Sequence, residues 1–325
     1  MAFIHIPKPW QLPESLATSE AAFLNRRRFM KGLIGAGIVS SLPLLGCQKQ
    51  VADGENPLWG TKPLGVVPNP AFAQVDRPLT NETLAATYNN FYEFGNSKHI
   101  WQAAQALPTK DWQIEVSGLV NNPRTYDLDD LQNRFPLEER TYRFRCVEAW
   151  AMVVPWVGFP MNAILKEVEP TAQAKFVRFT SFYDRQITKG PTFPPSQFLP
   201  FPYTEALRIE EMANDLAFFA VGIYGHTLPK QHGAPIRAVI PWKYGFKGAK
   251  SIAKIEFVDS QPATFWNTIS PNEYKFESNV EPEVPHPRWS QQKERLVGPG
   301  SQFSWEEVPT MLYNGYGEYV ASLYS

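Results

Sequence analysis

The stretch TYRFRCVEAWAMVVPW, residues 141–156, contains Cys146, the only cysteine after the first fifty residues. Successive side chains of a strand point to opposite faces, so Tyr142 and Phe144 share a face with Cys146 and two arginines occupy the other. This alternation predicts a strand whose inward-facing row ends at the thiol. A second element begins directly afterwards, within VEAWAMVVPW. The thiol therefore stands at a junction between elements, where binding and catalytic residues are often found.

The composition around this stretch is that of an ordinary globular protein. The chain has 325 residues, of which 43% are apolar and 19% are charged, and its net charge is −1. This balance argues against nucleic acid or acidic lipid as the main partner. The 30 prolines and the 14% aromatic content favour many short elements and long ordered loops over a helical bundle.

Several other segments carry strand patterns. Trp112, Ile114 and Val116 alternate with polar residues, which predicts a half-buried strand that ends in a turn at residues 121–123. The stretch at residues 127–135 predicts a short helix. Because no regular alternation of strands with long helices follows, the sequence argues against a Rossmann sheet and predicts one α+β domain of mixed sheets. Further strands are predicted at residues 176–183, 216–224, 236–242 and 252–258.

The N-terminal residues differ from the rest of the chain. NRRRFMK, residues 25–31, matches the twin-arginine export signal, and an uncharged run follows at residues 32–45. That run of about 14 residues is too short to span a bilayer of roughly 30 Å, but it suits the core of a signal peptide. We therefore expect residues 1–47 to direct export of the folded protein. This route is used by proteins that receive a cofactor in the cytoplasm.

Two features follow the export signal. LLGC, residues 44–47, resembles the site at which bacterial lipoproteins are cleaved and lipidated, so lipidation of Cys47 and ordinary cleavage both remain open. Residues 48–80 are rich in Pro, Gly, Asn and Ala with little periodicity, which predicts a linker or a surface wrap.

The residue types around Cys146 restrict the chemistry that the thiol can serve. The C-x-x-C-H motif of haem attachment and the several thiolates of an iron–sulfur cluster are both absent from the sequence. A Cys–His nucleophile remains open, as does a buried thiol without chemistry. A soft thiolate that holds one transition metal, with the other ligands supplied by an organic cofactor, fits a single cysteine well. Zinc is disfavoured because the histidines are scattered: His5, His99, His226, His232 and His286.

Four segments together resemble a known family. They are YNNFYEFG (residues 88–95), RFPLEERTYRFRCVEAWAMVVPWVGFP (134–160), QHGAPIRAVIPWKYGFKGAKSI (231–252) and HPRWSQ (286–291). They resemble the catalytic subunits of periplasmic protein-methionine-sulfoxide reductases, molybdenum enzymes of the sulfite oxidase fold family. The resemblance implies that residues 81–325 form a single sulfite-oxidase-like molybdopterin-binding domain with short helices and long ordered loops.

The resemblance also implies a set of site residues. Cys146 would ligate molybdenum together with the two sulfurs of molybdopterin. Two positions, Ser181 and His232, depart from the threonine and asparagine of one family member, although both can still form hydrogen bonds. The predicted cofactor contacts are Asn89, Tyr92 and Glu93 at the pterin, Ser181, His232 and Arg237 at the polar rim and phosphate, and the backbone of Gly248, Ala249 and Lys250 at the same end.

Charged residues near these positions raise two further expectations. Lys243 and Lys247 lie in the same glycine-containing stretch as Arg237 and Lys250, which strengthens the prediction of a phosphate site. Glu148, two residues past the thiol, is either a solvated acid or a proton donor whose pKa is raised in an apolar pocket. A salt bridge from Arg143 or Arg145 would instead lower its pKa.

The function implied by the resemblance is reduction of methionine sulfoxide in exported proteins. The electrons would come from a haem-bearing inner-membrane subunit, and the protein would act in the periplasm on oxidised periplasmic proteins. Two alternatives remain open at this point. One is a related molybdenum oxidoreductase that acts on sulfite or on other S- or N-oxides, and the other is an exported, non-catalytic binding lipoprotein.

Overall fold

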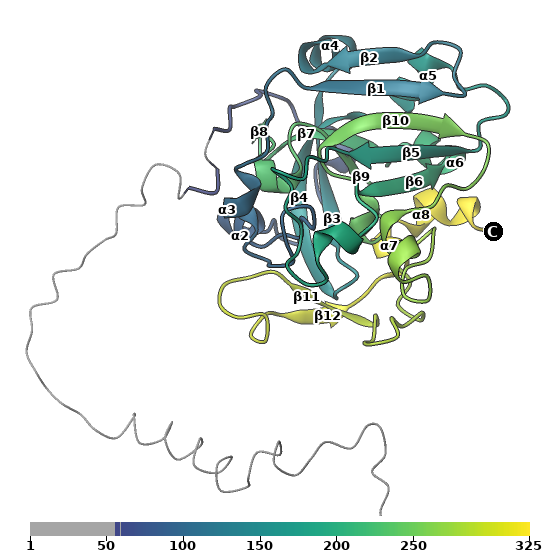
Figure 1. Ribbon diagram of the computed structural model, residues 1–325. Helices are drawn as coiled ribbons and strands as arrows, with labels where there is room; N and C mark the ends of the chain where they lie inside the picture. The colour runs from purple at the N-terminus through teal and green to yellow at the C-terminus, as the bar shows by residue number, and fades with distance from the viewer. Residues whose placement is uncertain (1–55, 59) are drawn as a thin grey trace, which may run out of the picture. The chain divides into compact units, whose positions relative to one another are not determined.

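The computed structural model describes residues 56–58 and 60–325, which are drawn in colour in Figure 1. The predicted export signal and Cys47 lie outside the described residues. Two mixed β-sheets and a set of short helices make up the described chain. The prediction of an α+β fold with mixed sheets is therefore confirmed.

The first sheet has the strand order β2-β1-β10-β5-β6. Strands β1 and β10 run parallel, and all other neighbours in this sheet are antiparallel. Alternate residues of β1 are buried, as the alternation of apolar and polar residues predicts. The strands are β1 (Gln113–Gly118), β2 (Arg124–Asp127), β5 (Phe176–Ser181), β6 (Thr204–Arg208) and β10 (Ile252–Val258).

The second sheet has the order β12-β11-β4-β7-β8, with β3 paired to β4 and β9 paired to β7. Its long central strand β4 has ten buried residues of eleven, because both of its faces are covered by packed side chains. The strands are β3 (Glu138–Arg145), β4 (Trp150–Pro160), β7 (Phe218–Ile223), β8 (His226–Thr227), β9 (Arg237–Val239), β11 (Lys293–Leu296) and β12 (Glu307–Pro309).

The helices in the described residues are short and lie at the ends and edges of the sheets (Figure 1). They are α2 (Glu82–Thr87), α3 (Trp101–Ala104), α4 (Leu128–Arg134), α5 (Asn162–Val168), α6 (Ile209–Ala213), α7 (Phe265–Ile269) and α8 (Gly317–Val320). Single 3₁₀ turns are η2 (Pro70–Phe72), η3 (Ser196–Phe198), η4 (Lys230–His232), η5 (Gly245–Lys247), η6 (Leu312–Gly315) and η7 (Ala321–Leu323). Among residues 56–58 and 60–325, no helix has the length and apolar character needed to cross a membrane.

The strand that leads to the thiol differs from its prediction in one respect. Tyr142 and Cys146 are buried, as expected, but Arg145 on the opposite face is also fully buried. Its guanidinium donates hydrogen bonds to Glu294 at 2.8 Å and to the Gln291 side chain at 2.6 Å. The arginine row therefore does not face water. It connects the end of β3 to the segment that precedes and forms β11.

Residues 60–80 run along the outer strands of the second sheet. The backbone N–H of Leu64 donates to the Gly225 carbonyl at 2.8 Å, and that of Asn69 donates to the Glu139 carbonyl at 2.8 Å. Further on, the N–H of Thr80 donates to Val153 of β4. These bonds pair part of the sheet edge, which otherwise presents unpaired backbone groups, and lead the chain to α2 beside the pocket.

Candidate functional site

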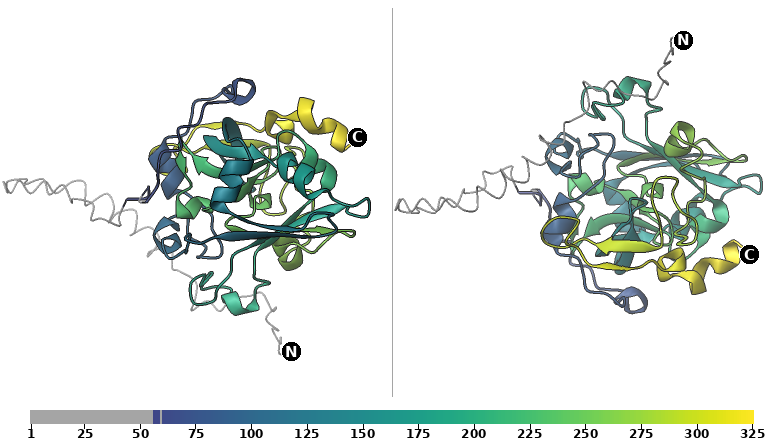
Figure 2. Two further views of the ribbon diagram at one scale, coloured as in Figure 1. Left: turned by 90° about the horizontal axis from the view of Figure 1, so that it is seen from above. Right: turned by 90° about the horizontal axis from the view of Figure 1, so that it is seen from below.

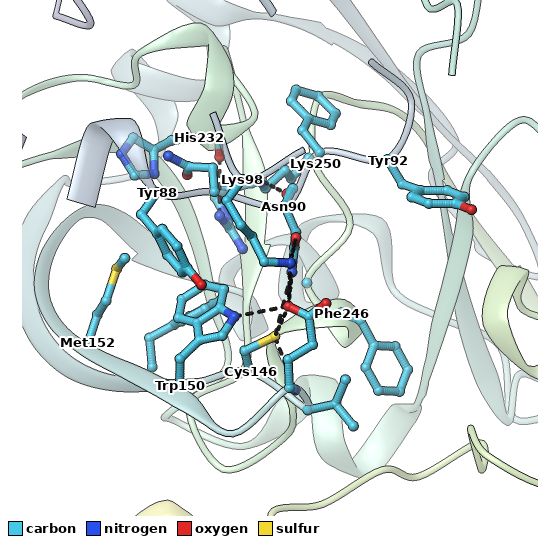
Figure 3. A pocket seen from close by; sticks show the side chains of 18 of the residues that line it. Tyr88, Asn90, Tyr92, Lys98, Cys146, Trp150, Met152, His232, Phe246 and Lys250 are labelled. Carbon is cyan, nitrogen blue, oxygen red and sulfur yellow. Dashed lines mark hydrogen bonds and ion pairs between the residues drawn. The ribbon is translucent and has the colours of Figure 1, made fainter. Parts of the chain in front are cut away.

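One pocket of about 190 Å³ lies where β3 ends, and Cys146 forms part of its wall (Figure 3). Its lining comes from segments far apart in the sequence, chiefly the loop after α2, the β3–β4 turn, strand β4 and the stretch from β9 to Lys250. Most of the lining is aromatic or aliphatic, and polar groups gather at two places. These residues are Tyr88, Asn89, Asn90, Phe91, Tyr92, Glu93, Asn96, Lys98, Phe144, Cys146, Val147, Glu148, Trp150, Met152, Val154, Trp156, Tyr203, His232, Arg237, Gly245, Phe246, Gly248, Lys250, Trp266 and Tyr274.

A tight turn between β3 and β4 presents the thiol to this pocket. The N–H of Ala149 donates to the Cys146 carbonyl at 3.1 Å, and the N–H of Cys146 donates to the Trp150 carbonyl at 2.9 Å. Ala149 adopts φ 63°, a left-handed conformation that few side chains accept, so the turn is sharply defined. The backbone N–H of Glu148 points at the sulfur, 3.5 Å away.

The surroundings of Cys146 disfavour a bare thiolate. Burial raises the pKa of the thiol well above its ordinary value, and the nearby Glu148 charge raises it further. Only a strong positive charge at the sulfur, such as a metal ion, would deprotonate it here. Among the described residues, no group of three or more His, Cys, Asp and Glu side chains could hold a metal by itself. A metal on this thiol would need its other ligands from an organic cofactor.

The first polar cluster lies directly over the sulfur and contains Glu148, Lys98 and Asn90 (Figure 3). The Lys98 ammonium is 2.5 Å from the Glu148 carboxylate and donates to the Asn90 side chain at 2.6 Å. Asn90 Nδ2 and Trp150 Nε1 donate to the same carboxylate oxygen at 2.9 and 3.0 Å. That oxygen lies 3.6 Å from Cys146 Sγ.

This cluster corrects the expectation for Glu148. Burial alone would raise the pKa of its carboxyl, but the Lys98 charge and the three hydrogen bonds outweigh burial, so the pKa lies below its ordinary value. The expected raised pKa is therefore wrong, and the ion-pair partner is Lys98 rather than Arg143 or Arg145. Arg143 pairs with Asp76, and Arg145 pairs with Glu294.

The second polar cluster lies around Arg237 and Lys250. Arg237 is buried, and within residues 56–58 and 60–325 no carboxylate lies within ion-pair distance of its guanidinium. Its Nη1 donates to the His232 carbonyl at 3.2 Å, and its guanidinium lies over the Trp156 ring at 4.9 Å. Lys250 donates to the carbonyls of Asn90 and Gln231 at 2.6 and 2.9 Å.

The charges at this end do not balance. Burial lowers the pKa of Lys250 and lowers that of Arg237 to about 10. Burial, assisted by these two cations, also keeps His232 neutral by lowering its pKa well below the ordinary value. The acid whose charge acts on Lys250 is Glu93, and burial raises the pKa of Glu93 to about 7. Two buried cations therefore face one carboxyl that is only partly ionised near neutral pH. The excess of positive charge suits an anionic group such as a phosphate.

Two orphaned polar atoms lie close to the second cluster. Glu93 Oε1 and Ser181 Oγ are buried and form no hydrogen bond of normal geometry among the described residues, although the Ser181 hydroxyl lies near enough to the Glu93 carboxyl to lower its pKa. Buried polar atoms without partners are uncommon in native proteins and often belong to ligand sites. The residues present therefore fit a cofactor with a metal-binding end at Cys146 and a polar, anionic end at Arg237 and Lys250.

Glycines allow the chain to approach the pocket closely. A Cβ atom at Gly245 would lie 2.3 Å from the Phe144 ring, and one at Gly248 would lie 2.6 Å from the Ala238 carbonyl oxygen and 3.0 Å from the Arg237 guanidinium. Contacts below 3 Å are not tolerated without movement of the neighbouring atoms. The stretch from β9 to η5 therefore depends on glycine to hold its place against β3 and Arg237.

The structure brings most of the predicted site residues together. Ser181 and Ala249 are buried but do not themselves line the pocket. Asn89 lines the pocket, although its amide donates to the carbonyls of Ala85 and Ala86 in α2. The other predicted residues that line the pocket are Tyr92, Glu93, Cys146, Glu148, His232, Arg237, Gly248 and Lys250.

Two of the four cations expected at the phosphate form ion pairs with carboxylates outside the pocket. Lys243 is paired with Glu211 at 2.6 Å, and Lys247 is paired with Glu205 at 2.7 Å. Both pairs are buried, and neither lysine lines the pocket. The expectation that they join Arg237 and Lys250 is therefore wrong, because a lysine already neutralised by its own carboxylate has little charge to offer a ligand.

The sequence interpretation did not identify Lys98, Asn90 and Trp150 as the hydrogen-bonding partners of the Glu148 carboxylate. Asn90 and Trp150 lie inside the segments YNNFYEFG and TYRFRCVEAW. The sequence therefore indicates that they lie near the site, but it does not predict their hydrogen bonds to Glu148. No pattern in the sequence singles out Lys98. It reaches the pocket only because the loop after α2 folds back over the β3–β4 turn.

Comparisons with known proteins agree with this geometry. Residues 101–266 match the family described as oxidoreductase molybdopterin binding domain. The protein-methionine-sulfoxide reductase catalytic subunit MsrP of Burkholderia mallei is 46% identical over 96% of this chain and 93% of its own length. The MsrP of Ralstonia nicotianae is 44% identical over 97% of this chain and 94% of its own length.

Among solved structures, the sulfane dehydrogenase SoxCD of Paracoccus pantotrophus is a distant match. It has a TM-score of 0.43 and 18% identity, over 60% of this chain and 50% of that chain. The near-complete coverage and high identity of the two curated relatives, together with the family match, decide the assignment. This chain belongs to the family of protein-methionine-sulfoxide reductase catalytic subunits and contains an oxidoreductase molybdopterin-binding domain.

Proposed function

We propose that this protein reduces methionine sulfoxide in exported proteins to methionine, using molybdenum bound to molybdopterin. The observation that carries the proposal is a single buried thiol in the wall of a pocket whose other polar end holds two buried cations. The names of the two curated relatives support the substrate.

The site residues divide the work of holding the cofactor. Cys146 would supply the thiolate ligand to molybdenum, which is a soft ligand for a soft site. Arg237 and Lys250 would hold the phosphate end, where each cation gains the negative partner that it lacks. Glu93, which lines the pocket, would accept or donate a hydrogen bond at the pterin, and the buried Ser181 hydroxyl lies beside its carboxyl. When bound, the cofactor supplies two-electron oxygen-atom transfer.

The remaining chemistry is proton delivery. Conversion of a sulfoxide to a thioether consumes two electrons and two protons and releases water. A proton donor must lie within hydrogen-bond reach of the reacting oxygen. The Lys98 ammonium is held over the pocket by Glu148 and Asn90, so we assign proton delivery to Lys98 Nζ. Glu148, as an ionised carboxylate, keeps that ammonium in place.

The electron source and the location belong to the same proposal. The curated relatives are named catalytic subunits, which supports a second subunit as the electron donor, and we propose a haem-bearing inner-membrane protein. The twin-arginine segment at residues 25–31 supports action in the periplasm. Fractionation of cells that express the full chain checks the location, since cytoplasmic retention of the wild-type protein would contradict it.

The proposed function is tested on the purified, cofactor-loaded protein. We expect bound molybdenum by elemental analysis and reduction of a methionine-oxidised protein with an artificial small reductant. Cys146→Ser should fold normally but lose molybdenum and activity, because a hydroxyl is a much harder ligand than a thiolate. Met152→Leu, in the same pocket, is the matched control and should keep both. Full activity of Cys146→Ser would remove the ligand assignment.

The same preparation distinguishes the alternative functions. Faster turnover of sulfite or of another S- or N-oxide than of oxidised protein would favour the related molybdenum oxidoreductase. A folded protein free of molybdenum after expression with the cofactor available would favour a non-catalytic binding protein.

A further inference from the structure

Two loops beside the pocket expose phenylalanine side chains to solvent. Phe193 and Phe198 are 81% and 75% exposed, and both lie in the loop of residues 190–204. Phe303 is 84% exposed and lies in the loop between β11 and β12. Single exposed apolar residues are common, but large apolar side chains grouped near a pocket often mark an interaction surface.

The first loop is fixed at its base to one side of the pocket. The N–H of Gly190 donates to the Glu93 carbonyl at 2.8 Å. Phe201 stacks on the pocket residue Tyr92, with ring centroids 6.4 Å apart, and on Tyr183, with centroids 5.1 Å apart. The tip that contains Phe193 and Phe198 therefore projects from an anchored base, and the loop with η3 stands out from the body in Figure 2.

The composition of this loop suits an apolar contact. GPTFPPSQFLPFPYT, residues 190–204, contains five prolines and no charged residue. Proline limits the conformations of a chain, so a partner that binds this loop has little ordering entropy to overcome. Two exposed phenylalanines add nothing to the core of the fold, and their place on a restrained, uncharged loop indicates that they contact another molecule.

The second loop is attached to the opposite side of the pocket. Trp305 packs edge to face on the pocket residue Tyr88, with ring centroids 5.0 Å apart, and the Tyr88 hydroxyl donates to Gln302 at 3.5 Å. Figure 3 shows Tyr88 and Tyr92 on opposite sides of the space over Cys146. The loop of Phe303 and the loop of Phe193 and Phe198 therefore flank the pocket.

We infer that these two loops form a docking surface for an extended, apolar segment of a client polypeptide. The inference rests on the proposed function, because a protein substrate must deliver one side chain into the pocket while its neighbouring residues remain outside. Phe193 and Phe198 on one side and Phe303 on the other bind the residues that flank the oxidised methionine. Folded surfaces seldom present such a segment, so the client is an unfolded or flexible part of a protein.

The test compares a peptide with a small substrate on the cofactor-loaded protein. The peptide is unstructured, fluorescently labelled and carries one methionine sulfoxide between leucines, and the small substrate is N-acetylmethionine sulfoxide. Phe303→Ser should weaken peptide binding, measured by fluorescence anisotropy, by about tenfold, as loss of one buried phenylalanine contact predicts. Phe193→Ser/Phe198→Ser removes two such contacts and should weaken binding by on the order of 100-fold. The kcat/KM for the peptide should fall by the same factor in each variant, while that for N-acetylmethionine sulfoxide stays unchanged.

A matched control and two contrary outcomes complete the test. Val67 is 76% exposed on the segment that runs along β3, so Val67→Ser removes a comparable apolar side chain elsewhere and should leave peptide binding unchanged. Unchanged peptide affinity in both loop variants overturns the inference. Equal losses for the peptide and the small substrate also overturn it, because the loops would then shape the pocket itself. Anisotropy measures binding without turnover. The effect of the loop variants on peptide binding can therefore be measured even if the proposed reductase activity is absent.

Discussion

Lys98, which no sequence pattern identified, is the residue to which we assign proton delivery. Its ammonium contacts both Glu148 and Asn90 over the thiol. Lys98→Met should reduce turnover by about 10²-fold with molybdenum content unchanged, since loss of a positioned proton donor costs about that much. Lys98→Arg keeps the positive charge but does not release a proton, so it should recover little of the rate. Recovery of the rate would show that the charge matters and not proton delivery. Steady-state kinetics and elemental analysis check both variants. Unaltered turnover in Lys98→Met would return proton delivery to another group.

The buried Glu93 carboxyl should make the stability of the protein depend on pH. Burial raises the pKa of its carboxyl from 4.5 to about 7, so the folded protein keeps a proton that the unfolded chain releases. This contribution to stability is complete below pH 4.5 and is lost as the pH rises through 7. Between pH 5 and pH 8, the stability advantage of the cofactor-free wild type over Glu93→Gln should therefore shrink by on the order of 3 kcal/mol.

Urea unfolding of both proteins at the two pH values measures this difference. Comparison with Glu93→Gln is needed because His232 has the opposite effect: its lowered pKa stabilises the fold as the pH rises through the ordinary histidine range. Parallel pH dependence in wild type and Glu93→Gln would show that Glu93 is ionised in the folded protein throughout this range.

At the scale of the element, the hairpin of β3 and β4 was predictable and its surroundings were not. The alternation of aromatic residues up to Cys146 predicted the strand, and the new element after it is β4. The burial of Arg145 was not predictable, because its partner Glu294 lies 149 residues further along the chain. Likewise, local sequence placed Lys243 and Lys247 with Arg237, whereas carboxylates from α6 and β6 pair with both lysines. Long-range pairing decides which charges remain free.

Gly248, directly after η5, lies close against the backbone and the Arg237 side chain of β9. Gly248→Ala would place a methyl group 2.6 Å from the Ala238 carbonyl and 3.0 Å from Arg237. The backbone must shift to accept it, so we expect a loss of about 1–3 kcal/mol in stability and weaker cofactor retention. At Gly298 the nearest atom is 3.7 Å away, so Gly298→Ala is the matched control and should change stability by less than about 0.5 kcal/mol. Thermal unfolding and molybdenum content measure both effects, and equal behaviour of the two variants would contradict the close-packing argument.

At the scale of the whole molecule, the fold buries one arginine that has no carboxylate partner among the described residues. Arg237 and Arg145 are both almost fully buried, yet only Arg145 has a carboxylate partner among the described residues, at 2.8 Å. A buried cation without a partner reduces the stability of a protein, so its removal can stabilise the fold. In a buried ion pair, removal of one partner is strongly destabilising, because the other charge is left buried. The two arginines therefore predict opposite responses to the same substitution.

Arg237→Met replaces the cation with an apolar side chain of similar length. The cofactor-free variant should be as stable as the cofactor-free wild type or more stable, by about 1 kcal/mol or more, because the cost of burying the charge disappears. Its cofactor content should nevertheless fall sharply, since the phosphate end loses a main partner. Arg145→Met should instead lose about 3 kcal/mol, because the buried Glu294 carboxylate then keeps only Arg77 as an ion-pair partner among the described residues and the hydrogen bonds of Arg145 to Gln291 and Thr310 are lost. Denaturant unfolding of the cofactor-free proteins and elemental analysis of the loaded ones measure these outcomes. If Arg237→Met is destabilised as much as Arg145→Met, then Arg237 holds the fold together rather than awaiting an anion.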